Sequence, residues 1–281
     1  MIFEHEIPDG SRLYFGKKAK QKRELEYNVS NILHDNDFEE IITPNFSYSQ
    51  HQSIQNSRKL IKFSDTNNEQ VSLRADSTLD VVRIITKRLG RTTSHKKWFY
   101  IQPIFTYPSN EEYQIGCEWI GHDNICDIIN LNVEILKQLN INPVLQIANI
   151  KIPRLISQEL GLDIELFKNG EIAQLFDLEN KWLSKLLEVK DINDLKNVVD
   201  LVPESIRPEV ECLINKASEI DYENIVISPL YYGSLKYYDG IYYRVIDDNL
   251  ILSRGGMYSS EGLTSLGFAL YTDSLLKILE D

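Results

Sequence analysis

Six polar or amphipathic side chains fall on or beside segments with a strand pattern, and their types suit a small charged ligand. They are Asp76, Thr78, Gln114, Glu118, Tyr237 and Tyr238. Gln114 and Glu118 are four residues apart on one expected strand, so both side chains point to the same face of a sheet. Carboxylate, amide and hydroxyl oxygens can accept hydrogen bonds from a cationic ligand. A solvated sheet face that binds nothing is the alternative that these residues leave open.

The motifs of several common enzyme classes are missing from the chain. None of the patterns GxxxxGK[ST], GxGxxG, HExxH and GxSxG occurs. The histidines, which show no metal-ligand spacing, are His5, His34, His51, His95 and His122. The cysteines, which form no CxxC pair, are Cys117, Cys126 and Cys212. We therefore expect no metal site and no disulfide framework.

The composition is that of a globular protein with an uneven charge distribution. The chain has 281 residues, 42% of them hydrophobic, and a net charge of −12. Residues 1–100 carry net +3 and residues 101–281 carry net −15. An acidic body repels phosphate backbones, which argues against extended nucleic-acid binding. The basic clusters at 17–23 and 87–97 are exceptions, and a solvated helix face is the simpler interpretation of each.

No apolar run approaches the ~18–20 residues that span a bilayer, and the acidic start MIFEHEIPDG is unlike a signal peptide. We therefore expect a cytoplasmic protein.

Hydrophobic periodicity predicts an α+β fold with a mostly antiparallel sheet and helices on its faces. Helices are expected at 17–34, 76–90, about 124–139 and the C-terminus, and strands at 38–42, 69–74, 97–107, 113–121, 144–150, 224–230, 240–245, 249–253 and 265–270. The region from about 152 to 222 is helical throughout, with breaks expected at Gly161, Gly170, Pro203 and Pro208. A turn is expected at Gly255 and Gly256.

Five segments carry motifs in a fixed order along nearly the whole chain: residues 7–44, 62–84, 99–121, 235–245 and 252–270. Together they resemble the class II aminoacyl-tRNA synthetase core of the histidyl-tRNA synthetase type, with motif 1, an L-R-P-[DE]-x-T segment, motif 2, the histidine-specific L-D-Y-Y-T-G segment and motif 3. The resemblance implies one class II core domain over residues 1–281. It also implies a helical insertion at about 152–222, between the motif 2 and motif 3 regions, and no C-terminal anticodon-binding domain.

Three positions depart from the synthetase pattern. Thr106, Gly233 and Ser274 stand where the family places arginines that hold ATP and stabilise the charge of the adenylation step. Removing one such group typically costs on the order of 10²–10³ in rate. The resemblance therefore implies that the chain has no catalytic residues, no cofactor and no aminoacylation activity.

The amino-acid side of the family's site is largely kept. By resemblance, Asp76, Thr78 and Gln114 would hold the α-ammonium of histidine, while Glu118 and Tyr238 would contact its imidazole, with Tyr237 beside them. Lys236 replaces the usual aspartate of this segment.

A histidine pocket without an ATP clamp or a tRNA reader resembles the regulatory subunits of ATP phosphoribosyltransferase, which are paralogues of histidyl-tRNA synthetase. The resemblance implies a dimer through the motif 1 region and a hetero-oligomer, an octamer, with the short-form catalytic subunit of histidine biosynthesis. Histidine would be the feedback effector, and neither tRNA nor a membrane would be a partner. A truncated histidyl-tRNA synthetase-like ligase and a free-standing histidine-binding dimer remain open alternatives.

Overall fold

The computed structural model describes residues 6–48, 57–233, 238–260 and 262–280. The chain folds as two compact units. Unit 1 comprises Met1–Ile120, Ser260–Leu263 and Ala269–Asp281, and unit 2 comprises Gly121–Ser259 and Thr264–Phe268. The expectation of one core domain with a helical insertion stays a prediction.

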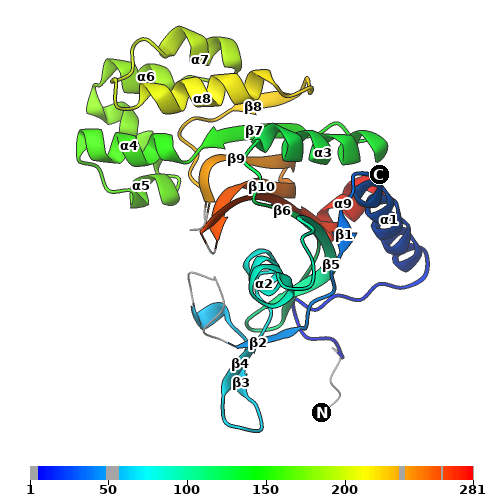
Figure 1. The fold of residues 1–281 in the computed structure, drawn as a ribbon. Helices are drawn as coiled ribbons and strands as arrows, with labels where there is room; N and C mark the ends of the chain where they lie inside the picture. The colour runs from blue at the N-terminus through cyan, green and yellow to red at the C-terminus, as the bar shows by residue number, and fades with distance from the viewer. Residues whose placement is uncertain (1–5, 49–56, 234–237, 261, 281) are drawn as a thin grey trace. The chain divides into compact units, whose positions relative to one another are not determined.

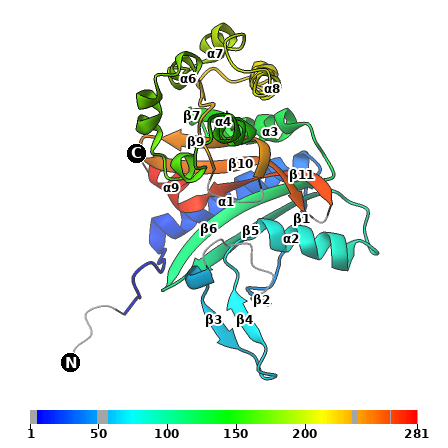
Figure 2. The ribbon, with the colours of Figure 1, turned by 90° about the vertical axis from the view of Figure 1, so that its left-hand side faces the viewer.

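Unit 1 is built on a long hairpin of strands β5 (Lys97–Thr106) and β6 (Asn110–Ile120), which pair antiparallel along their whole length. The short strand β1 (Glu39–Glu40) runs parallel to β5. A separate small sheet has the order β2-β4-β3, from strands β2 (Phe46–Tyr48), β4 (Gln70–Leu73) and β3 (Lys62–Ser64). This small sheet is drawn in cyan and blue in Figure 2.

The helices of unit 1 come from both ends of the chain. They are α1 (Gly16–Asp35), the 3₁₀ turn η2 (Ser57–Lys59), α2 (Thr78–Arg83), the π-helix η3 (Ile84–Leu89) and α9 (Thr272–Leu279). Helices α1 and α9 lie side by side, as Figures 1 and 2 show in blue and red. The expected helix at 17–34 is confirmed, because Leu25, Val29, Ile32 and Leu33 form one buried stripe.

Unit 2 combines an antiparallel meander with a group of short helices (Figure 1). Its strands have the order β11-β10-β9-β7-β8, and they are β7 (Val144–Asn149), β8 (Ile225–Ile227), β9 (Tyr238–Asp247), β10 (Leu250–Ser260) and the middle of β11 (Leu263–Tyr271). Its helices are α3 (Ile125–Gln138), α4 (Lys151–Leu160), α5 (Glu165–Lys168), η4 (Ile172–Leu178), α6 (Lys181–Leu187), α7 (Ile192–Val198) and α8 (Arg207–Ser218). The predicted α+β class with mostly antiparallel pairing is confirmed.

Two local predictions, one at a pair of glycines and one at a proline, are wrong. Gly255 and Gly256 lie inside β10 and form no turn, because a Cβ at either position would come within 2.6 Å of the Tyr243 ring or 2.9 Å of the Tyr238 ring. Pro208 does not break a helix but stands in the first turn of α8, where its missing N–H costs nothing. Gly161 does end α4 as predicted, with φ +64°.

Among the described residues, no helix has both the length and the apolar character needed to cross a membrane.

Candidate functional site

The hairpin of unit 1 sets the register of the predicted ligand-binding residues. Gln102 lies opposite Gln114, and Trp98 lies opposite Glu118. Side chains alternate along a strand, so Gln114 and Glu118 share one face with Tyr100 and Gln102 of the neighbouring strand. Gln114 and Glu118 are buried, at 7% and 0% exposed. The shared face that the spacing predicts is the face on which the polar contacts of this site occur.

Gly116 makes room for the central side chain of this face. A Cβ at Gly116 would lie 2.2 Å from the Tyr100 ring, closer than real Cβ contacts. The ring of Tyr100 therefore lies over the backbone of β6, where it is completely buried. Only glycine allows this approach, so the hydroxyl of Tyr100 is placed by a residue on the opposite strand.

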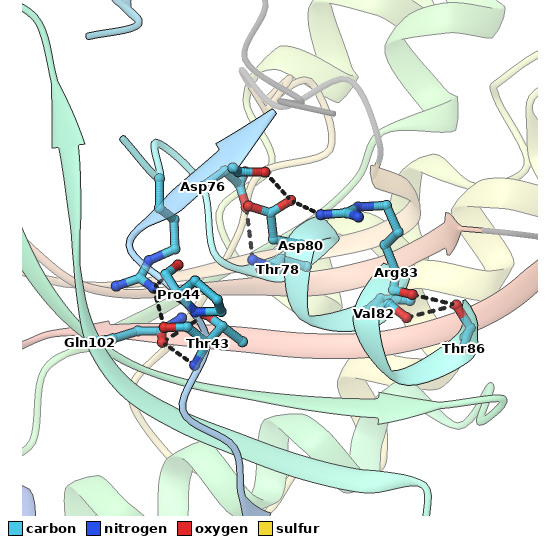
Figure 3. Close-up of polar contacts among 11 residues, drawn as sticks. Thr43, Pro44, Asp76, Thr78, Asp80, Val82, Arg83, Thr86 and Gln102 are labelled. Atoms are coloured by element: carbon cyan, nitrogen blue, oxygen red, sulfur yellow. Dashed lines mark hydrogen bonds and ion pairs between the residues drawn. The ribbon is translucent and has the colours of Figure 1, made fainter. Parts of the chain in front are cut away.

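Tyr100 links the two carboxylate-bearing parts of the cluster. Its hydroxyl donates to Glu118 Oε1 at 3.3 Å and lies 3.4 Å from Thr78 Oγ1. Thr78 is tied to Asp76, whose Oδ1 accepts the Thr78 backbone N–H at 2.8 Å, as Figure 3 shows. Burial, together with the Glu118 carboxylate beside it, raises the pKa of Tyr100 well above its usual value. The phenol therefore stays neutral and keeps its donor.

Asp76 and Ser77 both have a residue type that is common at the N-cap of a helix, and both precede α2. The N-cap position is Ser77, and its side chain makes no capping bond. Ser77 Oγ instead accepts from Gln102 Nε2 at 3.1 Å. Gln102 Oε1 in turn accepts from Thr43 Oγ1 at 3.0 Å (Figure 3). This chain of bonds fixes the start of α2 against β5.

Gln114 has a different partner from the rest of the cluster. Its Nε2 donates to Glu112 Oε1 at 2.7 Å, two residues earlier on the same strand. The Gln114 backbone is nevertheless paired with Gln102, the strand residue that holds the start of α2. Of the six predicted residues, Asp76, Thr78 and Glu118 are brought together through Tyr100, and Gln114 is beside them on the hairpin.

Arg74 is a buried side chain that holds several chain segments of unit 1 together, which we call its framework role. Its guanidinium donates to Pro103 O at 2.7 Å from Nη2 and to Thr43 O at 3.1 Å and Pro44 O at 3.0 Å from Nη1. Nη2 also donates to Asn45 Oδ1 at 3.0 Å. Desolvation lowers the pKa of Arg74 to about 10, because burial penalises its charged form. These bonds join the segment after β1 to strand β5. Arg74 itself is two residues before Asp76 in the sequence.

Tyr238 belongs to unit 2. It begins β9, is 5% exposed and packs edge-on against Tyr242 with the ring centres 4.9 Å apart. Arg154 Nη2 donates to its carbonyl oxygen at 3.4 Å and Arg154 Nη1 to Asp239 Oδ1 at 3.3 Å. Tyr237 lies outside the described residues, as does Lys236.

The three positions where the resemblance predicts arginines in a synthetase carry small side chains. Thr106 ends β5 and pairs with Asn110 across the hairpin. Gly233 is buried, and a Cβ there would be 3.5 Å from the Tyr242 ring. Ser274 is in the first turn of α9. None of these three side chains can supply the bidentate, permanently charged fork of a guanidinium.

The chemistry available to the unit 1 cluster is recognition of a cation by oxygen acceptors. Asp76 and Thr78 are half-buried, whereas Glu118 is fully buried behind them. Within the described residues, no group of three or more histidine, cysteine, aspartate and glutamate side chains could hold a metal ion.

Sequence reasoning missed Tyr100, Gln102 and Arg74. Tyr100 and Gln102 could have been found from strand alternation, because they are two apart on the strand that pairs with Gln114 and Glu118. The role of Arg74 has no local signal, since its acceptors are about 30 residues away in both directions.

Comparison with known proteins gives a consistent set of relatives. The family model described as histidyl-tRNA synthetase matches residues 14–275. The ATP phosphoribosyltransferase regulatory subunit of Wolinella succinogenes is 45% identical over 277 residues, covering 99% of this chain and 96% of that protein. The protein of the same name from Helicobacter hepaticus is 40% identical and covers 99% of each chain. The histidine–tRNA ligase of Methanococcus aeolicus is 26% identical, and the match covers 76% of that enzyme.

Solved structures with low sequence identity share the fold. A structure described as an ATP phosphoribosyltransferase regulatory subunit/histidyl-tRNA synthetase from Bacillus halodurans superposes with a TM-score of 0.88 at 17% identity, covering 99% of this chain and 84% of that one. The histidyl-tRNA synthetase of Nostoc superposes with a TM-score of 0.80 at 16% identity, covering 99% of this chain and 76% of that enzyme. The predicted class II synthetase-like fold is confirmed by these neighbours.

Proposed function

Because the chain belongs to the ATP phosphoribosyltransferase regulatory subunits, a histidyl-tRNA synthetase-like family, we propose that it binds the short-form catalytic subunit, activates it and makes it sensitive to histidine. The observation that carries this proposal is the identity of 45% and 40% with two proteins of that name over nearly their full length. The histidine–tRNA ligases match at lower identity and extend beyond the matched region.

We infer that the chain has no adenylation activity of its own. The support is the set of small side chains at Thr106, Gly233 and Ser274, where a synthetase needs guanidinium groups on ATP. A protein without chemistry acts on an enzyme by binding one of its states more tightly than another. The regulatory role therefore needs a partner surface and an effector site, but no catalytic group and no cofactor.

The effector that we propose is histidine, held by the unit 1 cluster. Asp76, Thr78 and Gln114 would receive its α-ammonium, since carboxylate, hydroxyl and amide oxygens all accept hydrogen bonds. Glu118 would accept from the imidazole ring. We expect the ligand to take over the hydrogen bond that Tyr100 now donates to Glu118, so that a buried carboxylate keeps a donor in both states. The contacts of Tyr237 and Tyr238 with histidine stay predictions from the resemblance.

The assembly that we propose has two levels. Helix α1 and strand β1 correspond to the motif 1 region, so a two-fold dimer of this chain would use them in an isologous interface. The dimer would then join the catalytic subunits in a hetero-octamer. We propose that this assembly works in the cytoplasm, as part of histidine biosynthesis, and without tRNA.

Complex formation with the catalytic subunit tests the proposal. The chain and the short-form transferase of the same organism are mixed and analysed by size-exclusion chromatography with light scattering. A single species containing both chains at a fixed ratio is the expected result. Separate elution of the two proteins at tens of micromolar would reject the regulatory-subunit role and favour the free-standing histidine-binding dimer.

A further inference from the structure

The loop between η3 and β5 carries positive charge that the folded chain does not use. Arg91 and Lys96 are exposed, and neither makes an ion pair or side-chain hydrogen bond with any described residue. They belong to one of the two basic clusters in this acidic chain, and the proposed regulatory role assigns no task to it. Most other basic side chains near this loop are paired, such as Arg83 with Asp80 at 2.9 Å and Lys97 with Asp37 at 3.8 Å.

A cleft of about 500 Å³ opens beside these two cations. The loop from Gly90 to Lys96 lines it, together with Thr86 and the apolar residues Ile85, Ile120 and Leu263, which we call its apolar floor. No acidic side chain is among the described residues that line it. The volume is within the ~300–1,000 Å³ range of small-molecule sites. Cations on the rim and an apolar floor suit an anion that also carries a less polar part.

The loop also presents hydrogen-bonding groups to the same space. Ser94 and Thr93 line both this cleft and a second one of about 430 Å³. His95 Nε2 is buried and has no hydrogen-bond partner within the described part of the chain. A buried ring nitrogen without a partner is uncommon in a folded protein, because its desolvation is not repaid. The loop therefore has one unused polar atom close to two unused cations.

The backbone holds this loop in a defined conformation. The carbonyl oxygen of Leu89 accepts three hydrogen bonds, from the Thr92 and Thr93 backbone N–H groups and from Thr92 Oγ1. Thr93 Oγ1 accepts the His95 N–H at 3.1 Å, and the His95 carbonyl accepts from the Trp98 indole at 3.2 Å. The carbonyl at the end of η3 is thus satisfied locally. The loop begins after a π-helix, a rare element that often occurs at functional sites.

We propose that this cleft is a second effector site, which binds a phosphate-bearing small molecule. Arg91 and Lys96 would pair with the phosphate oxygens, Ser94 would donate to them, and the His95 ring would turn to bring Nε2 to the phosphate as a further donor. The apolar floor would contact the sugar or base of a nucleotide or phosphosugar. Phosphate fits better than a single carboxylate, because two cations and several donors match a multiply charged anion with several acceptor oxygens. The site is in unit 1 and is separate from the histidine cluster in its residues.

Calorimetric titration of the whole chain with inorganic pyrophosphate, at constant ionic strength, tests this site. Wild type is expected to bind with a Kd below about 1 mM, and Arg91→Gln with Lys96→Gln to weaken binding at least tenfold. The matched control is Lys190→Gln with Lys196→Gln, which removes the same charge from exposed positions of unit 2 and should leave the affinity unchanged. Equal thermal unfolding of the three proteins would show that the substitutions act on binding.

Two further titrations identify the source of the phosphate. ATP that binds more tightly than pyrophosphate would indicate that the apolar floor receives a nucleoside, and tighter binding of ribose 5-phosphate would indicate a phosphosugar. Absence of pyrophosphate binding at millimolar concentration would overturn the proposal. An equal loss of affinity in the unit 2 control would also overturn it, because the effect would then come from net charge alone. Neither outcome bears on histidine binding or on complex formation.

Discussion

Glu118 has the most specific environment of the residues proposed to bind histidine. It is completely buried, and its carboxylate accepts from a tyrosine whose raised pKa keeps the donor in place. A buried acceptor has no water to bond with, so a ligand that offers it no donor leaves it unpaired. The difference in binding free energy between a ligand with a donor and one without is therefore larger at a buried acceptor than at an exposed one. We therefore expect Glu118 to determine selectivity for the imidazole ring.

Replacement of Glu118 by glutamine keeps the size of the side chain and removes its charge. A hydrogen bond to a charged group contributes about 1.5–3 kcal/mol, so Glu118→Gln should weaken histidine binding roughly ten- to a hundredfold. Calorimetry measures the two affinities. The control is Glu204→Gln, an exposed carboxylate of unit 2, whose loss should change nothing. Equal histidine affinity in wild type and Glu118→Gln would show that the pocket no longer serves regulation.

Single residues of this site were predictable to different degrees. The spacing of Gln114 and Glu118 is enough to place them on one face, since strand alternation is a local property. The position of Tyr100 depends on its pairing with Gly116, which no local pattern specifies. A tyrosine in an apolar strand is usually read as core, and its hydroxyl becomes part of the site only through the register of the hairpin.

At the level of elements, one buried arginine joins the two chain segments that flank the start of α2. Arg74 donates to the carbonyl groups of Thr43, Pro44 and Pro103, so it connects the chain after β1 with strand β5. Asp76 and Thr78 follow within four residues. The orientation of the ligand-binding segment therefore depends on a contact that joins parts of the chain about 30 residues apart.

Replacement of Arg74 by lysine keeps the charge but removes the planar fork. Lysine has three donors on one atom and cannot reach all these acceptors together, so buried carbonyl groups lose their partners. The expected loss of unfolding free energy is about 2–4 kcal/mol. Urea denaturation followed by circular dichroism measures it. The control Arg12→Lys keeps the charge of an exposed arginine that pairs with the half-buried Asp273, and it should change stability by less than about 0.5 kcal/mol. A similar small change for Arg74→Lys would refute the framework role.

Element types were largely predictable from periodicity, but glycine and proline positions were not. The helix expected at 17–34 is α1 almost to the residue, because its apolar stripe is a local signal. Gly255 and Gly256 look like a turn, yet they lie inside β10 because tyrosine rings from β9 occupy the space of their side chains. Pro208 looks like a break and instead starts α8. The glycines are explained by the tyrosine rings on the neighbouring strand, and the proline by its position in the first turn of its helix. A local sequence pattern contains neither piece of information.

At the scale of the whole molecule, the proposed dimer predicts which exposed apolar residues are covered. Ile42 follows β1 and is 82% exposed in the single chain. A new carboxylate at this position would be buried without a partner in a motif 1 interface, which costs free energy. We therefore expect Ile42→Asp to weaken the dimer at least tenfold, and wild type to be a dimer at tens of micromolar.

Light scattering over a dilution series measures the dimer affinity. The control Leu201→Asp makes the same change at a 55% exposed residue in the helical part of unit 2, and its dimer should match wild type. A monomeric wild type, or an unchanged dimer in Ile42→Asp, would contradict an interface through this region.

The proposed absence of adenylation activity has a direct assay. Exchange of labelled pyrophosphate into ATP in the presence of histidine should not exceed the rate without protein, because Thr106, Gly233 and Ser274 offer no guanidinium to ATP. A working histidyl-tRNA synthetase serves as the positive control. Clear exchange by this chain would favour the ligase alternative.

We propose that this chain has no chemistry of its own and controls a catalytic partner through histidine. The most direct measurement is a titration of the short-form transferase with this chain, with and without histidine, followed by the rate of its own reaction. We predict that the rate rises to a plateau at a fixed ratio of the two chains, and that histidine lowers this plateau. With Glu118→Gln, the plateau rate without histidine should be unchanged, because this substitution alters only the proposed histidine site. Much more histidine should be needed to lower the rate, because the variant binds histidine more weakly and inhibition is coupled to that binding. A transferase rate that does not change when the chain is added, or a plateau insensitive to histidine, would contradict the account.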